Sequence, residues 1–78
     1  MTLDEAPTGS GCVVRHSHGR PALVRRLAEL GIRSGERVRV LHRTAGGGRV
    51  VAVSDTRIAL SRAVLRGVEI DLDPAGSA

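Results

Sequence analysis

The sequence predicts a mainly β domain, a small and strongly bent barrel of five short strands with one helix after the first strand. Its 78 residues give room for one domain with a thin core. Apolar residues recur every three or four positions over residues 21–30, and every second position from residue 38 onward. Short alternating segments then follow one another across Gly-rich and polar turns. A barrel is favoured because a flat sheet of such strands would leave long edges unpaired.

The helix is expected at about residues 21–30, after a short apolar strand that opens with "CVVR" at residue 12. Pro21 suits the first turn of a helix, where its missing amide hydrogen leaves no bond unmade. Leu23, Leu27 and Leu30 are spaced by four and three residues, which gives the helix one apolar face. We therefore expect that face to pack on the sheet.

The end of this helix is predicted at Gly31. Glycine adopts the left-handed conformation that closes many helices, and Ile32 directly after it can fold back on the last turn. Residues 34–35, Ser-Gly, make the next turn. The strand "RVRVLHR" follows, with Val38 and Val40 on its inward face.

The rest of the chain is predicted to be a meander. "TAGGG" closes a hairpin to the strand "RVVAV", and Ser54-Asp55 forms a tight turn to the strand "TRIAL". Residues 62–66 fit one short helical turn ended by Gly67, and "VEIDL" is the last strand. Residues 1–10 and 73–78 carry little apolar surface and no period, so we expect a loose lead, a domain over 11–72 and a flexible tail.

Composition limits the functions that this chain can perform. It contains no Phe, Tyr or Trp, so single-stranded nucleic acid would find no aromatic stacking platform. All twelve basic residues are Arg and the formal net charge is +4, yet they are scattered, and a nucleic-acid partner is disfavoured. The start has no signal-peptide pattern and no apolar run is long enough to insert into a membrane, so we expect a cytoplasmic protein.

Cys12, His16 and His18 are the nearest approach to a metal site. On an extended strand these three side chains would share one side, and Cys with two His suits zinc or a similar ion. The alternative is a small core cysteine followed by a polar loop. His42 lies on the inward parity beside Leu41, so we expect a bulge or the end of the strand there, and a partly buried, hydrogen-bonded imidazole.

Enzyme motifs are missing from the chain. There is no nucleophile-elbow sequence, and "AGGGR" lacks the Lys-Ser/Thr ending of a phosphate-binding loop. We therefore expect no catalysis, no cofactor and no dedicated metal site. Metal binding by the Cys-His segment and a small basic nucleic-acid-binding barrel remain alternatives.

Residues 25–70, "RRLAELGIRSGERVRVLHRTAGGGRVVAVSDTRIALSRAVLRGVEI", resemble the FeoA family of ferrous iron transport accessory proteins. The resemblance rests on "RRLAELGI", "SGERVRV", the hairpin, "DTRIAL" and the terminal Gly-Val-x-Ile. It implies an SH3-like barrel with an inserted helix, non-catalytic and cytosolic, and a FeoB-type membrane transporter with a GTP-binding domain as the partner.

The expected partner site is the groove between the end of the helix and the neighbouring strands. Leu30, Gly31 and Ile32 would shape it, while Arg57 and Arg62 would add charge complementarity to an acidic partner. The sequence also leaves a weak homo-oligomer open.

Overall fold

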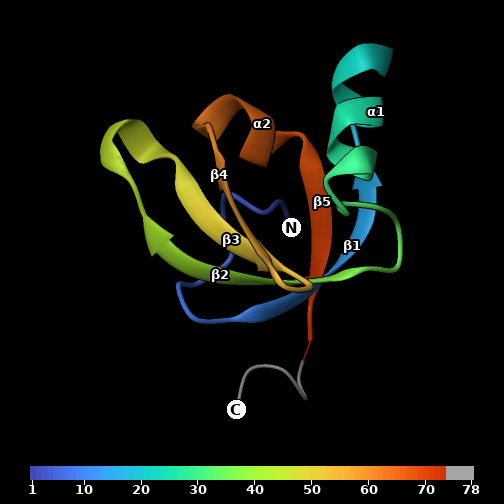
Figure 1. Ribbon diagram of the computed structural model, residues 1–78. Helices are drawn as coiled ribbons and strands as arrows, with labels where there is room; N and C mark the ends of the chain where they lie inside the picture. The colour runs from blue at the N-terminus through green and yellow to red at the C-terminus, as the bar shows by residue number, and fades with distance from the viewer. Residues whose placement is uncertain (74–78) are drawn as a thin grey trace.

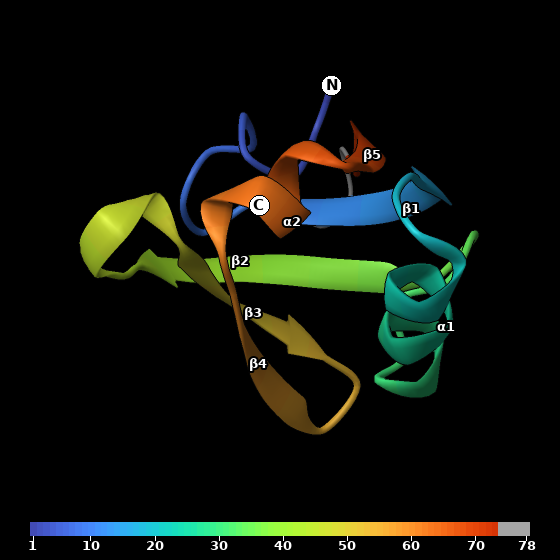
Figure 2. The ribbon, with the colours of Figure 1, turned by 90° about the horizontal axis from the view of Figure 1, so that it is seen from above.

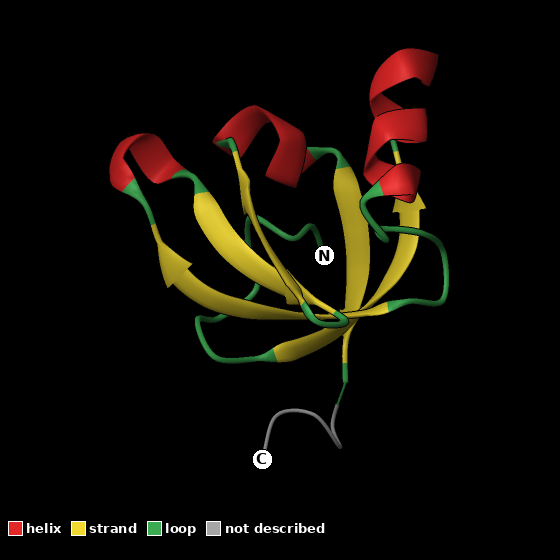
Figure 3. Cartoon of the chain, viewed as in Figure 1, coloured by secondary structure: helices red, strands yellow, loops and turns green. Residues whose placement is uncertain are grey.

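The computed structural model describes residues 1–73, in which five antiparallel strands form one bent sheet and two short α-helices lie along one rim of it (Figures 1 and 3). The elements are β1 Gly11–Ser17, α1 Pro21–Glu29, β2 Arg37–Arg43, β3 Arg49–Val53, β4 Thr56–Leu60, α2 Arg62–Arg66 and β5 Val68–Leu72, with a 3-10 turn at Ala45–Gly47. The strand order is β4-β3-β2-β1-β5. The mainly β prediction, the helix near residues 21–30 and the helical turn near 62–66 are confirmed.

The core is aliphatic and lies on the concave side of the sheet. Alternate residues of each strand point inward, as the two-residue period predicts. The buried apolar residues are Leu3, Ala6, Cys12, Val14, Leu27, Ile32, Val38, Val40, Val51, Val53, Leu60, Leu65, Val68 and Ile70. Only Leu27 of α1 is fully buried, so this helix is held mainly by its C-terminal turn.

That turn has the geometry expected of a glycine-capped helix. Gly31 has a φ of 102°, and its amide donates to the carbonyl of Ala28 at 3.0 Å. The Ile32 amide donates to the carbonyl of Leu27 at 2.8 Å, which completes the paired bonds of a Schellman motif. Because Ile32 is also buried, the cap fixes α1 to the core.

The hairpins also form where they are predicted. The amide of Thr44 donates to the carbonyl of Gly48 at 2.9 Å, which closes the β2–β3 connection. Ser54 and Asp55 link β3 to β4, where Val53 and Thr56 face each other, and Ser54 has a φ of 54°. Local turn residues therefore set the meander.

The prediction that residues 1–10 form a loose lead is wrong. Leu3 has no exposed surface, and its amide donates to the carbonyl of Val68 at 2.8 Å. Thr2 forms a bridge with Glu69, so the first residues run beside the outer edge of β5. Two buried residues, Leu3 and Ala6, are too few to give a period, but they fill the core once the segment pairs with an edge strand.

The expected tail over residues 73–78 is described only at its first residue. Asp73 is largely buried, and its amide donates to the carbonyl of Gly11 at 3.0 Å. The remainder of that prediction lies outside the described residues.

Candidate functional site

A partly apolar groove lies between α1 and the strand β4, with the first turn of α2 at one end. Its volume is about 460 Å³. In Figure 2 the β3–β4 hairpin extends toward α1 on this side of the molecule. The groove is lined by Leu23, Arg26, Leu27, Leu30, Thr56, Arg57, Ile58, Ala59, Leu60, Ser61 and Val64.

Leu30 is the main exposed apolar side chain of this groove. It follows the last residue of α1 and precedes the glycine cap, so its side chain lies at the end of the helix and is 38% exposed. Leu23, Ile58 and Val64 are partly buried and pack against the core nearby. A partner side chain could therefore be seated on a fixed aliphatic surface.

Two guanidinium groups border the aliphatic surface. Arg26 comes from α1 and Arg57 from β4, and both side chains are exposed. Neither forms an ion pair within residues 1–73. The groove therefore combines an apolar floor with positive charge that no carboxylate of the described chain neutralises.

The structure brings together only part of the site expected from the sequence. Leu30 and Arg57 line the groove. Ile32 is buried in the core, and Gly31 lies so close to Val53 that a Cβ there would be 2.8 Å from its Cγ1. Arg62 points away from the groove into a different hollow, beside Gly47. Gly31 and Ile32 thus shape the groove only by fixing the end of α1.

Sequence reasoning missed most of the groove's aliphatic lining. Leu23, Ile58 and Val64 come from α1, β4 and α2, three elements that meet only in the folded chain. A signal was present in the sequence. Leu23, Leu27 and Leu30 form an apolar stripe, and the core fully covers only Leu27, so the rest of the stripe is left to line a groove.

Cys12, His16 and His18 do not converge. The register of β1 against β5 shifts between Val14 and His16, so a bulge reverses the alternation. Cys12 is buried while His16 and His18 are exposed, and the two imidazoles contact each other edge to face at 4.4 Å between ring centroids. His18 Nε2 instead pairs with the Glu69 carboxylate.

His42 also differs from expectation. Of the two expected features, the bulge is present, between Val40 and His42 of β2, and the strand continues to Arg43. The bulge places His42 opposite Val50 on the exposed side. The imidazole is therefore exposed rather than partly buried.

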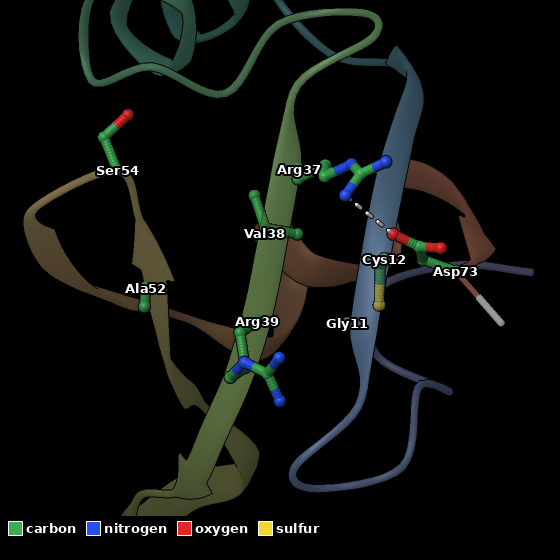
Figure 4. A pocket seen from close by; sticks show the side chains of 8 residues that line it. All are labelled: Gly11, Cys12, Arg37, Val38, Arg39, Ala52, Ser54 and Asp73. Atoms are coloured by element: carbon green, nitrogen blue, oxygen red, sulfur yellow. Dashed lines mark ion pairs between the residues drawn. The ribbon is translucent and has the colours of Figure 1, made fainter. Parts of the chain in front are cut away.

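A second hollow crosses β1, β2 and β3, with Asp73 just after β5 at its border (Figure 4). Its volume is about 270 Å³, and Arg37 and Asp73 pair across it at 3.5 Å. Cys12 lies beneath this pair, and burial raises the pKa of its thiol, so the thiolate is disfavoured. The hollow offers neither an activated nucleophile nor an unpaired carboxylate.

Two further features of residues 1–73 bear on function. The side chains of His, Cys, Asp and Glu gather nowhere in threes at distances suited to a metal ion. Neither α-helix in this part of the chain has the length and apolar content needed to cross a bilayer.

Comparison with known proteins identifies the fold and the family. FeoA from Chlorobium tepidum is 26% identical, with a TM-score of 0.86 over 92% of this chain and 70% of its own. FeoA from Stenotrophomonas maltophilia, solved with zinc and described as a prokaryotic SH3 domain protein, is 37% identical. Its TM-score is 0.76 over 97% of this chain and 93% of its own. The manganese regulator SloR shares only the fold, at 15% identity and a TM-score of 0.79 over 92% of this chain and 34% of its own.

No curated protein matches the sequence significantly. The FeoA domain model matches residues 1–72, nearly the whole chain and including the first ten residues. The bent five-stranded sheet, the inserted helix and this match agree, and the chain belongs to the FeoA family.

Proposed function

We propose that this chain is a non-catalytic, cytoplasmic accessory protein of ferrous iron uptake, and that it binds the cytosolic part of a FeoB-type transporter through the α1–β4 groove. The relative from Stenotrophomonas maltophilia is described as a suggested activating factor of bacterial ferrous iron transport. The observation that carries the proposal is the exposed aliphatic floor around Leu30, bordered by Arg26 and Arg57, which form no ion pair within residues 1–73.

The position of β4 at the edge of the sheet favours a partner segment in extended conformation. The first residues of the chain run beside β5 at one end of the strand order. β4 stands at the other end, pairs with β3, and forms one wall of the groove. A partner segment can add to such an edge by main-chain hydrogen bonds while its side chains enter the groove.

Charge complementarity defines the chemistry of that segment. Arg26 and Arg57 favour an acidic sequence with at least one large apolar side chain. The apolar side chain would contribute most of the affinity by contact with Leu30 and Ile58, and the carboxylates would set the association rate and register.

Titration calorimetry with the purified cytosolic domain of the cognate transporter tests this proposal. We expect saturable binding that Leu30→Ser weakens roughly tenfold, because a buried leucine contributes about 1.5–3 kcal/mol and part of Leu30 is already covered. Leu72→Ser is the matched control, since Leu72 is similarly exposed at 40% but lies on β5. Equal weakening by both variants, or no binding by the unaltered chain, contradicts the proposal.

The charged border has a separate test. Arg57→Gln is expected to lower the association rate and to reduce its dependence on salt, with a smaller effect on the dissociation rate. Arg20→Gln removes an exposed charge that does not line the groove and serves as the control. Stopped-flow or surface-based kinetics at two salt concentrations distinguishes the two variants, and identical rates would refute the role of Arg57.

A further inference from the structure

Three arginine side chains meet at the turn end of the β2–β3 hairpin, away from the groove. Arg43, Arg49 and Arg62 line a hollow of about 330 Å³ together with Asp4 and Gly47. Figures 1 and 2 show how the tip of this hairpin and α2 lie near each other at one end of the sheet. We call these three residues the arginine cluster.

The bulge in β2 brings two members of this cluster together. Before the bulge Val40 pairs with Val51, and after it Arg43 pairs directly with Arg49. Arg49 and Val51 share the inward parity of β3, so the shift brings Arg43 to the same side as Arg49. Like charges directly opposite each other on one face are destabilising, and this pair therefore requires a compensating feature.

Arg62 reaches the cluster from the first residue of α2. Its aliphatic stem passes over Gly47, where an added Cβ would lie 3.1 Å from Arg62 Cδ. Gly47 has a φ of 86°, a conformation that glycine adopts readily. A glycine here thus allows the third arginine to approach the other two.

Arg49 is the most unusual member because it is only 5% exposed. Its Nη1 donates to the carbonyl of Ala6, a neutral acceptor, and it forms no ion pair within residues 1–73. Asp4 shares the hollow, but its carboxylate pairs with Arg66, at 3.9 Å. A buried charge that forms no ion pair is costly, so a negatively charged ligand would stabilise this arrangement.

We propose that the arginine cluster binds a small phosphate-bearing anion. Guanidinium groups present paired N–H donors that match phosphate oxygens, and three of them facing one hollow favour a ligand with at least two negative charges. The hollow is of a size that suits a small ligand such as pyrophosphate or a phosphate monoester. This site is separate from the groove and does not depend on the proposed function.

The test uses the intact chain and inorganic pyrophosphate, with inorganic phosphate and glycerol 3-phosphate as parallel ligands, at constant ionic strength. We expect saturable binding by calorimetry and chemical-shift changes at the amides of residues 43–49 and 62. Tighter binding of pyrophosphate than of the two monophosphates would identify a free polyphosphate as the ligand class. Tighter binding of glycerol 3-phosphate than of the other two ligands would identify a phosphate ester. Both results support a phosphate site.

Arg43→Gln and Arg62→Gln should each weaken pyrophosphate binding about tenfold or more, since hydrogen bonds to charged groups are the strong ones. Both side chains are exposed, so the fold should survive, which a thermal melt followed by circular dichroism confirms. Arg25→Gln removes the same charge from α1 and should change affinity by less than about twofold. Absence of saturable binding to all three ligands, or equal weakening by all three variants, overturns the proposal.

Discussion

Replacing Gly31 by alanine tests how the end of α1 is fixed to the sheet. Alanine at this position meets two separate obstacles. The φ of 102° disfavours any residue with a Cβ, and that Cβ would lie 2.8 Å from Val53 Cγ1. Gly35 has nearly the same φ, 90°, but a Cβ there meets nothing within 4 Å. Comparing alanine variants of the two glycines therefore separates the cost of the backbone conformation from the cost of the steric contact with Val53.

The magnitudes follow from these two terms. A positive φ costs a non-glycine residue about 1–2 kcal/mol, which is the whole effect expected for Gly35→Ala. Overpacking a core costs about 1–3 kcal/mol more, so Gly31→Ala should destabilise the protein by about 2–5 kcal/mol. A domain of this size has roughly 4–12 kcal/mol of stability, so the difference between the two variants is measurable.

Urea unfolding followed by far-ultraviolet circular dichroism is the appropriate assay, because the chain has no Trp or Tyr for fluorescence. In a Val53→Ala background the contact with Cγ1 is removed, and Gly31→Ala should then cost only the backbone term. Equal losses for Gly31→Ala and Gly35→Ala in the unaltered chain, or no coupling between Gly31→Ala and Val53→Ala, would refute the reasoning.

Three further predictions concern the termini and the titratable groups. Leu3→Ala should lower the free energy of unfolding by about 2–5 kcal/mol, measured by the same urea titration, whereas a loose lead would give no change. The hydrogen bond from His18 and the charge of His18 hold the pKa of Glu69 below its ordinary value. The ionised Glu69 therefore stabilises the folded state above the pKa that Glu69 has in the unfolded chain, and this contribution is lost as the pH falls through its pKa in the folded protein. Glu69→Gln should therefore make stability depend less on pH between about pH 5 and pH 3, and an unchanged slope would contradict this. Burial raises the pKa of Cys12, so a thiol reagent should label it slowly in the native protein and rapidly in urea, and fast native labelling would show that the thiol is accessible.

The sequence was sufficient for the features that depend on local signals. The helix end at Gly31 and Ile32 follows from a glycine and one apolar residue, and the structure shows the expected bonds. The inward positions of Val38 and Val40 follow from the two-residue period. These features were predictable because neighbours in the sequence decide them.

Features that depend on strand register were only partly predictable. One bulge in β1 separates Cys12 from His16, and one in β2 moves His42 outward. Each inserts a residue that reverses the alternation. Leu41 marks the bulge in β2, although not the side to which His42 turns, whereas the residues beside the bulge in β1 carry no such mark.

Long-range packing accounts for the remaining differences. Leu3 is buried only because the edge of β5 is free to accept the first residues, and Arg62 reaches the hairpin tip because Gly47 leaves space for its stem. The groove likewise combines α1, β4 and α2, which are far apart in the sequence. Contacts of this kind leave no periodic pattern in the sequence.

The most direct measurement of partner binding is a chemical-shift map of the isotope-labelled chain titrated with the transporter's cytosolic domain. The proposed function predicts that the amides of residues 26–30 and 56–60 shift or broaden most, in proportion to complex formed. Shifts confined to β1, β5 and the hollow around Arg37 and Asp73, with the groove unaffected, would contradict it.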